Sequence, residues 1–245
     1  MTCLVYGIVF SRGESCLGLP LPQVMPHGVG GAPVRLIEAN GLGAAVSTVE
    51  EPGLTPTVAN ALAYAKVVEA IHAQSTIMPM RYGCTCAGED EAVLLLQTHG
   101  GQYSEILRRV EGCVELAVHV SLPCACPEDT PSPLVARGPS TAAAYLAGRA
   151  SLYAARDQRT REVASATERI RAAFGDHYVY FRAGGADDQQ AGVSAIFLVK
   201  RANLASFHAA FVKFAGTEPG TPRLSGPWPP YNFVIPEASH GRRPS

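Results

Sequence analysis

Five prolines crowd a short stretch in the middle of the chain and limit what it can fold into. They are Pro123, Pro127, Pro131, Pro133 and Pro139. Proline has no backbone N–H and a fixed φ, so this stretch sustains neither a helix nor a strand ladder. The total of 245 residues suits two small domains. The sequence therefore predicts a first domain at 1–122, a linker at 123–139, a second domain at 140–236 and a frayed tail at 237–245.

The first domain begins with patterns typical of strands. Residues 4–10 form a continuous apolar run, which indicates a strand buried on both faces. Residues 34–39 and 44–49 flank Asn40-Gly41, a frequent two-residue hairpin turn. A helix is predicted over residues 57–73, because apolar residues recur there every three or four positions. This predicted buried stripe consists of Val58, Leu62, Ala65, Val68 and Ile71.

The rest of the first domain is predicted to be a strand within 75–82, a helix beginning near Glu89 and a strand at 113–122. Gly100-Gly101 lies inside the helical pattern and costs about 1 kcal/mol per glycine, so two helices are also compatible with it. In the last strand apolar residues alternate with polar ones, which places Glu115 on the exposed side.

The second domain is predicted to be α+β. A helix capped by Ser140 or Thr141 is expected to run to about Phe174, with Tyr153 among its stripe residues. The charged residues at 156–162 are interpreted as a solvated face of this helix. Strands are expected at 179–182 and 193–201, a helix at 204–214 and an extended ending at 223–235, in the order of the chain.

Charge and hydropathy exclude several classes of partner. Only 17% of the residues are charged and the net charge is −1, so the electrostatic attraction that dominates nucleic-acid binding is missing, and no membrane partner is expected. The low charged fraction favours a protein partner instead. Because the first residues lack the pattern of a signal peptide and no apolar run spans a bilayer, a cytoplasmic location is expected. The seven cysteines are then expected to be free thiols.

Thiol chemistry is the main alternative reading. Cys84-Thr85-Cys86 and Cys124-Ala125-Cys126 could supply four zinc ligands, although Cys-x-Cys pairs are poor knuckles. Cys84 also follows Arg81, which would favour a thiolate. The alternative function is therefore a cytosolic thiol- or metal-dependent enzyme that uses Cys84 and Cys86 with a histidine.

Several unusual strings remain unexplained by these patterns. They are YGIV at 6–9, AAVSTV at 44–49, IMPMRYG at 77–83, VEGCVE at 110–115 and LSGPWPPYNF at 224–233. In order and spacing they resemble the gas vesicle protein GvpF/GvpL family, with Tyr82 where that family usually has phenylalanine. The C-terminal string is the most specific match.

The resemblance implies a fold, partners and interface residues. It implies an α+β protein with an N-terminal ferredoxin-like α/β sandwich domain and a C-terminal α+β domain that has a long helix and a small antiparallel sheet. It implies a non-enzymatic accessory protein without a cofactor or metal, located in the gas vesicle. The implied partners are the gas vesicle shell protein (GvpA type) and other gas vesicle accessory proteins. The structural or interface candidates are Arg81, Tyr82, Gly83, Pro227, Trp228, Pro229, Pro230 and Tyr231.

Two of these candidates have specific predicted roles. Arg81 follows a stiff strand end, where a fixed guanidinium could bond several carbonyls or a carboxylate, so it is predicted to be structural or interfacial. Residues 227–231 carry three prolines and must lie along an edge or a groove. Trp228, the only tryptophan, is predicted to be a plug between the two domains, with an anchor for a partner as the alternative.

Overall fold

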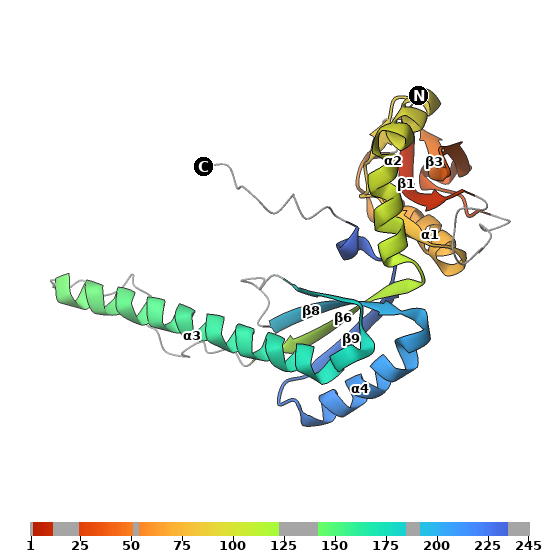
Figure 1. Cartoon of the computed structure of the whole chain (residues 1–245). Coiled ribbons are helices and arrows are strands. Elements are labelled where there is room, and N and C mark those ends of the chain that lie inside the picture. Colours follow the sequence, from red (N-terminus) through yellow and green to blue (C-terminus); the bar gives the residue numbers. More distant parts are fainter. Residues whose placement is uncertain (1, 12–24, 51–53, 123–141, 185–191, 235–245) are drawn as a thin grey trace. The chain divides into compact units, whose positions relative to one another are not determined.

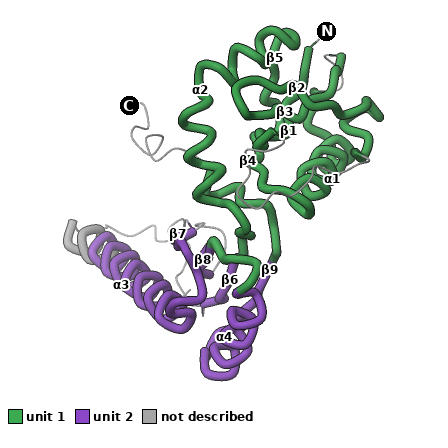
Figure 2. Tube along the Cα trace, turned by 45° about the vertical axis from the view of Figure 1, so that its right-hand side comes forward, with its two compact units in different colours: residues 1–116, 198–202, 226–245 green, residues 117–197, 203–225 purple. Residues whose placement is uncertain are grey.

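The computed structural model describes residues 2–11, 25–50, 54–122, 142–184 and 192–234, without the side chains of residues 142–148. The chain forms two compact units (Figure 2). The first unit contains Met1–Leu116, Leu198–Ala202 and Gly226–Ser245, and the second contains Ala117–Phe197 and Asn203–Ser225. These units divide the chain differently from the predicted domains, because the first unit also takes two later segments. The predicted linker and tail lie outside the described residues.

The first unit is built on a five-stranded sheet (Figure 1). Its strands are β1 (Thr2–Phe10), β2 (Arg35–Ala39), β3 (Leu42–Val49), β4 (Ile77–Pro79) and β5 (Thr85–Cys86). The order is β2-β3-β1-β4, β5 also pairs with β1, and each of these pairs is antiparallel. From Cys3 onward β1 is buried along its whole length, which confirms the prediction from its continuous apolar run.

The hairpin of β2 and β3 also confirms its prediction. Asn40 has a φ of 50° and Gly41 a φ of 76°, so both turn residues have the left-handed backbone that a tight two-residue hairpin turn requires. Asparagine and glycine adopt this conformation at low cost.

Two helices pack on this sheet. They are α1 (Val58–Gln74) and α2 (Glu89–Val110). Helix α1 starts where the sequence predicted, because the Thr57 hydroxyl accepts a hydrogen bond from the Asn60 N–H at 3.2 Å. It packs against the face that carries Ala45 and Val49. Leu42, which lies beside Gly100 of α2, points to the opposite face by strand alternation.

The buried face of α1 differs from the predicted one. Val58 and Leu62 are 79% and 58% exposed, so the predicted stripe is wrong at its N-terminal end. The buried residues are Tyr64, Val67, Val68, Ile71 and His72. Both sets fit the helical period. The contacts of Tyr64 with the sheet orient the helix, and sequence spacing contains no information on those contacts.

Helix α2 runs unbroken through Gly100-Gly101, so the alternative of two helices is wrong. Leu96 lies buried before the glycines, and Ile106, Leu107 and Val110 lie buried after them. Burying such side chains stabilises the fold by about 1.5–3 kcal/mol each, which exceeds the cost of two helical glycines.

The order of elements in the first unit is three strands, a helix, two strands and a helix. This order departs from the β-α-β-β-α-β order of a ferredoxin-like fold. The next strand, β6 (Cys113–Ser121), pairs in a second sheet whose order is β7-β8-β6-β9.

The second unit contains most of this second sheet and two helices. The elements after β6 are α3 (Ala142–Phe174), β7 (Tyr180–Ala183), β8 (Gly192–Lys200), α4 (Leu204–Thr217) and β9 (Pro222–Trp228), and the last residues of β8 and β9 belong to the first unit. Short 3-10 helices lie at Val29–Gly31, Gly175–His177, Arg201–Asn203 and Tyr231–Phe233. These bounds agree with the predicted order of elements in the second domain, although the predicted extended ending turns into a 3-10 helix after β9.

An aromatic cluster forms the core of the second unit. Phe197 of β8 lies 5.1 Å from Phe174 of α3 and 5.2 Å from Phe207 of α4, measured between ring centroids. Phe174 and Phe207 stack at 4.3 Å. Because one side chain of the sheet touches both helices, α3 and α4 cover the same face.

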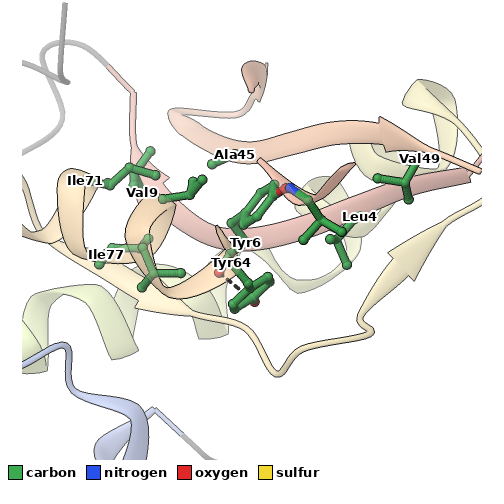
Figure 3. Packing of buried hydrophobic residues seen from close by; sticks show 11 residues of the cluster. Leu4, Tyr6, Val9, Ala45, Val49, Tyr64, Ile71 and Ile77 are labelled. Atoms are coloured by element: carbon green, nitrogen blue, oxygen red, sulfur yellow. Dashed lines mark hydrogen bonds between the residues drawn. The ribbon is translucent and has the colours of Figure 1, made fainter. Parts of the chain in front are cut away.

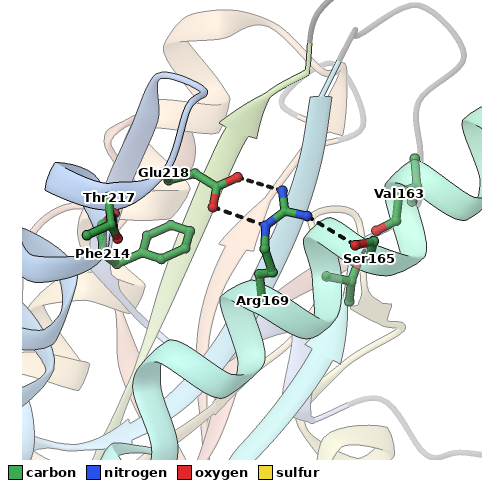
Figure 4. A network of polar contacts seen from close by, with 7 residues as sticks. Val163, Ser165, Arg169, Phe214, Thr217 and Glu218 are labelled. Atoms are coloured by element: carbon green, nitrogen blue, oxygen red, sulfur yellow. Dashed lines mark hydrogen bonds and ion pairs between the residues drawn. The ribbon is translucent and has the colours of Figure 1, made fainter.

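Among the residues of α3 whose side chains are described, those in the C-terminal part anchor the helix. Arg169 donates two hydrogen bonds to the Glu218 carboxylate, at 2.7 and 3.2 Å, and a third to the Ser165 hydroxyl (Figure 4). Residues 149–158 are exposed, which agrees with a solvated face, and so is Tyr153, which the predicted stripe had placed in the core. The mixture of helices with antiparallel pairing confirms the predicted α+β class.

Candidate functional site

The predicted site residues lie in the first unit, and Tyr64 of α1 supports the set at 81–83. The Tyr64 hydroxyl lies within hydrogen-bond distance of the carbonyl oxygens of Met80 (2.8 Å), Tyr6 (3.0 Å) and Val5 (3.2 Å). Figure 3 shows Tyr64 beside Tyr6 in the packed interior. Burial raises the pKa of Tyr64 far above its ordinary value, so the phenol stays protonated as a donor. Tyr64 therefore fixes the end of β4, just before Arg81.

Tyr6 joins two of the strings singled out in the sequence. Its hydroxyl lies 2.8 Å from the Ser47 hydroxyl and accepts a hydrogen bond from the Val29 N–H at 2.9 Å. Its ring stacks on Tyr64, with centroids 4.9 Å apart. Ser47 is fully buried, and this bond satisfies its hydroxyl. A Cβ at Gly28 would lie 2.0 Å from the Tyr6 oxygen, so glycine is required at that position.

Residues 81–84, the Arg81 turn, follow directly after this cluster. The Cys84 N–H donates to the Arg81 carbonyl at 3.1 Å, and Gly83 has a φ of 88°. Glycine suits this position because its φ is positive. The Tyr82 ring lies edge-on to Tyr64 with centroids 5.4 Å apart, and its hydroxyl donates to the Thr55 carbonyl at 3.3 Å. Tyr82 and Gly83 thus contribute contacts and backbone conformation to this turn, and their predicted interface role stays a prediction.

The position of Arg81 does not match the structural role that was predicted for it. Its side chain is exposed, and its guanidinium group forms no hydrogen bond or ion pair with any residue in the described part of the chain. The expected bonds to several carbonyls or to a carboxylate are therefore not formed within the described ranges. The interface role of Arg81 stays a prediction.

Residues 226–234, the C-terminal segment, begin at the end of β9. Because β9 is an outer strand of the second sheet, the predicted edge position of Pro227 and Trp228 is confirmed. Pro229 and Pro230 are buried. Tyr231 is partly buried and packs against the same core cluster as Tyr82. The predicted site residues at 81–83 and at 227–231 are therefore both anchored on this core cluster, through Tyr82 and Tyr231.

Trp228 is the large apolar side chain that the C-terminal segment leaves exposed. Its side chain is 46% exposed, in contrast to the two prolines that follow it. This exposure is too large for a tightly packed plug, so it favours the alternative role as an anchor for a partner. Sequence reasoning had favoured the plug because large aromatic residues are usually well buried.

Sequence reasoning missed the carboxylate that holds the C-terminal segment. Glu115 of β6 is only 6% exposed, not on the solvent side as predicted. Its Oε2 accepts a hydrogen bond from the Asn232 backbone N–H at 2.8 Å, and its Oε1 accepts one from the Asn232 side-chain amide at 2.7 Å. Two acceptors on one ionised group match two donors on one residue, which makes these bonds strong and directional.

A second contact reinforces this attachment. The Arg109 guanidinium donates to the Phe233 carbonyl at 2.6 Å. The pKa of Tyr231 is raised to about 12, first by burial and then by the negative charges of Glu69 and Glu115. The signal for these contacts was present in the sequence, because the strings at 110–115 and 224–233 supply Glu115, Asn232 and Phe233. The sequence did not indicate that Glu115 would bind Asn232 or that Arg109 would bind Phe233.

Among the described residues, Cys84 and Cys86 lack the environment of a catalytic thiolate. Burial raises the pKa values of Cys84 and Cys86, which disfavours thiolates and opposes the expected activation of Cys84 by Arg81. No group of three metal-ligating side chains occurs within the described residues. Cys124 and Cys126 lie outside those residues.

This arrangement is suited to binding. A rigid backbone, fixed by buried tyrosines and by Glu115, carries two exposed side chains that binding surfaces commonly use, an arginine and a tryptophan. No described helix combines the length and the apolar character that a membrane span requires.

Comparisons with known proteins agree with this picture. The model of the family described as gas vesicle synthesis protein GvpL/GvpF matches residues 2–235. The fold is similar to a crystal structure of the gas vesicle protein GvpF from Anabaena sp. PCC7120, with a TM-score of 0.70, 17% identity and 99% of each chain covered. It is also similar to gas vesicle protein GvpF from Microcystis aeruginosa, with a TM-score of 0.71, 13% identity, and 96% of this chain and 99% of that chain covered. No curated protein sequence matches the chain.

Proposed function

Because the chain belongs to the GvpL/GvpF family of gas vesicle synthesis proteins, we propose that it is an accessory protein of gas vesicle assembly. It binds the shell protein (GvpA type) and other gas vesicle accessory proteins, and it acts in the cytoplasm at the growing vesicle. It has no catalytic step of its own. The raised pKa values of Cys84 and Cys86 count against the alternative of a thiol enzyme.

The exposed Trp228 carries this proposal. Tryptophan is among the residues that contribute most to protein interfaces, and a 46% exposed indole has apolar surface available for a partner. Pro227 and Pro229 flank it, and Glu115 holds the segment that follows. Little backbone entropy is therefore lost when a partner covers the ring.

The prolines around Trp228 also limit how a partner can bind. Pro222 and Pro227 lie in β9, at the edge of the sheet, and they cannot donate ladder hydrogen bonds. At an edge without these prolines, shell subunits with exposed apolar surface could pair with β9 and extend the sheet one strand after another. We infer that the partner binds through side-chain contacts with Trp228 and does not extend the sheet.

The test is co-expression of the full chain with the shell protein, followed by capture on a tag of this chain. Trp228→Ala should reduce the captured shell protein by about tenfold or more, since interface tryptophans often contribute at least 2 kcal/mol. The matched control is Val212→Ala. Val212 is a 71% exposed apolar residue on α4, outside the proposed surface, and its replacement should leave capture unchanged.

Urea unfolding of each variant separates binding from stability. Because Trp228 is half-exposed, its replacement should cost less than the about 3–5 kcal/mol that a fully buried tryptophan costs. If the Trp228→Ala variant captures as much shell protein as the wild-type chain, the proposal that the shell protein binds at Trp228 is contradicted. Failure of the wild-type chain to capture shell protein would contradict the proposed function itself.

A further inference from the structure

Two buried cysteines lie directly opposite each other in the first unit. Cys3 of β1 is paired with Cys86 of β5 in the antiparallel register. Their side chains are 3% and 5% exposed. Opposite residues of an antiparallel pair project to the same face of the sheet, so the two thiols are neighbours on one face.

The spacing of this pair suits a disulfide. The Val5 N–H donates to the Cys84 carbonyl at 2.9 Å, which places Val5 and Cys84 at a hydrogen-bonded position of the antiparallel ladder. Such pairs recur every second residue, so Cys3 and Cys86 form the next one, with a Cα separation of about 5.5 Å. Disulfides join residues whose Cα atoms lie about 4.4–6.8 Å apart.

Cys84 is less well placed than either member of this pair. Cys84 precedes β5, and residues two apart in a fully extended chain are about 6.8 Å apart, at the limit of disulfide geometry. Cys3 and Cys84 are diagonal neighbours, about 7–8 Å apart. The register therefore singles out one pairing among these three thiols.

We propose that Cys3 and Cys86 form a reversible disulfide by exchange with a low-molecular-weight disulfide such as oxidised glutathione. The Cys86 thiolate attacks one glutathione sulfur and releases one glutathione thiolate. The Cys3 thiolate then attacks the Cys86 sulfur and releases the second. The two protons lost by the cysteines are taken up by the two leaving thiolates, so two protein thiols are oxidised and one glutathione disulfide is reduced to two glutathiones.

The disulfide would act on the Arg81 turn. Strand β5 has only two residues and directly follows this turn. A covalent bond to the central part of the sheet would hold β5 in place and so fix one end of the turn that carries the exposed Arg81. Burial of both thiols makes exchange depend on local opening of this short strand. The modification is independent of whether the chain binds a shell protein.

The experiment uses the full chain with Cys16, Cys124 and Cys126 replaced by serine, so that thiols outside the described residues cannot compete. The protein is equilibrated in glutathione buffers of increasing oxidation, trapped by alkylation and mapped by mass spectrometry of unreduced peptides. Oxidised protein should contain peptides linked through Cys3 and Cys86, with Cys84 and Cys113 alkylated. Addition of Cys84→Ser should preserve the link, whereas Cys86→Ser should abolish it.

Thermal unfolding supplies a second measurement. The oxidised protein should unfold at a higher temperature than the reduced protein, because the bond restricts the unfolded chain. The Cys86→Ser variant should show no such difference. Alkylation of both Cys3 and Cys86 in the most oxidising buffer, or a Cys84–Cys86 link in their place, would overturn the proposal.

Discussion

The attachment of the C-terminal segment by Glu115 is the contact most open to measurement. Glu115→Gln is nearly isosteric, but it replaces one acceptor oxygen with an NH₂ group. In the wild-type protein the Glu115 carboxylate accepts hydrogen bonds from two donors of Asn232. In the variant one of those donors must face another donor, so one of the two hydrogen bonds is lost and the other becomes neutral.

The expected cost follows from these contacts. Loss of one hydrogen bond to a charged group costs about 1.5–3 kcal/mol. Part of this cost is offset, because a neutral amide is easier to bury than a carboxylate, and Glu115 is only 6% exposed. We expect a net loss of about 2 kcal/mol, which corresponds to a decrease of about 4–8 °C in Tm for a chain of this size.

Urea and thermal unfolding of the full chain measure this effect. Glu105→Gln is the matched control, because it removes the same charge at an exposed position of α2 and should change stability by less than about 0.5 kcal/mol. A double-mutant cycle with Asn232→Ala should give a coupling energy of about 1 kcal/mol or more. A loss below about 0.5 kcal/mol in Glu115→Gln, or a coupling energy near zero, would refute this account.

Three further variants test other parts of the first unit. Burial, and secondarily the Arg201 charge, lowers the pKa of His72 to about 3. Between pH 6.5 and pH 5 the unfolded chain therefore gains a proton at His72, while the folded chain does not. The free energy of unfolding should fall by about 2 kcal/mol over this range. Urea unfolding at both pH values should show that His72→Leu removes this part of the loss; an unchanged loss would contradict the assignment. Gly226→Ala should destabilise by about 2–4 kcal/mol in the same assay, because φ is 109° and the new Cβ would lie 2.6 Å from the Glu115 carbonyl oxygen; a neutral result would contradict this geometry. Arg81→Lys should change stability by less than about 0.5 kcal/mol but weaken shell-protein capture; unchanged capture would end its interface role.

Much of the local structure could be predicted from neighbouring residues. Asn40-Gly41 specified the hairpin because both residues tolerate a positive φ. Thr57 specified the start of α1 because its hydroxyl caps an N–H three residues ahead. The unusual strings, in their order and spacing, were enough to identify the family. For the candidate site, the sequence placed Arg81 after a strand end and residues 227 and 228 at an edge.

Other features were decided only by tertiary contacts. The face that α1 buries depends on the bonds of Tyr64 to three carbonyls, and the continuity of α2 depends on apolar residues packed on both sides of its glycines. Glu115 followed a pattern that predicted exposure, yet it is buried because its two partners lie on a residue 117 positions later in the chain. Periodicity reports which side chains share one face of one element. It contains no information on which distant donor will meet a buried acceptor, because that pairing forms only when the whole chain has packed.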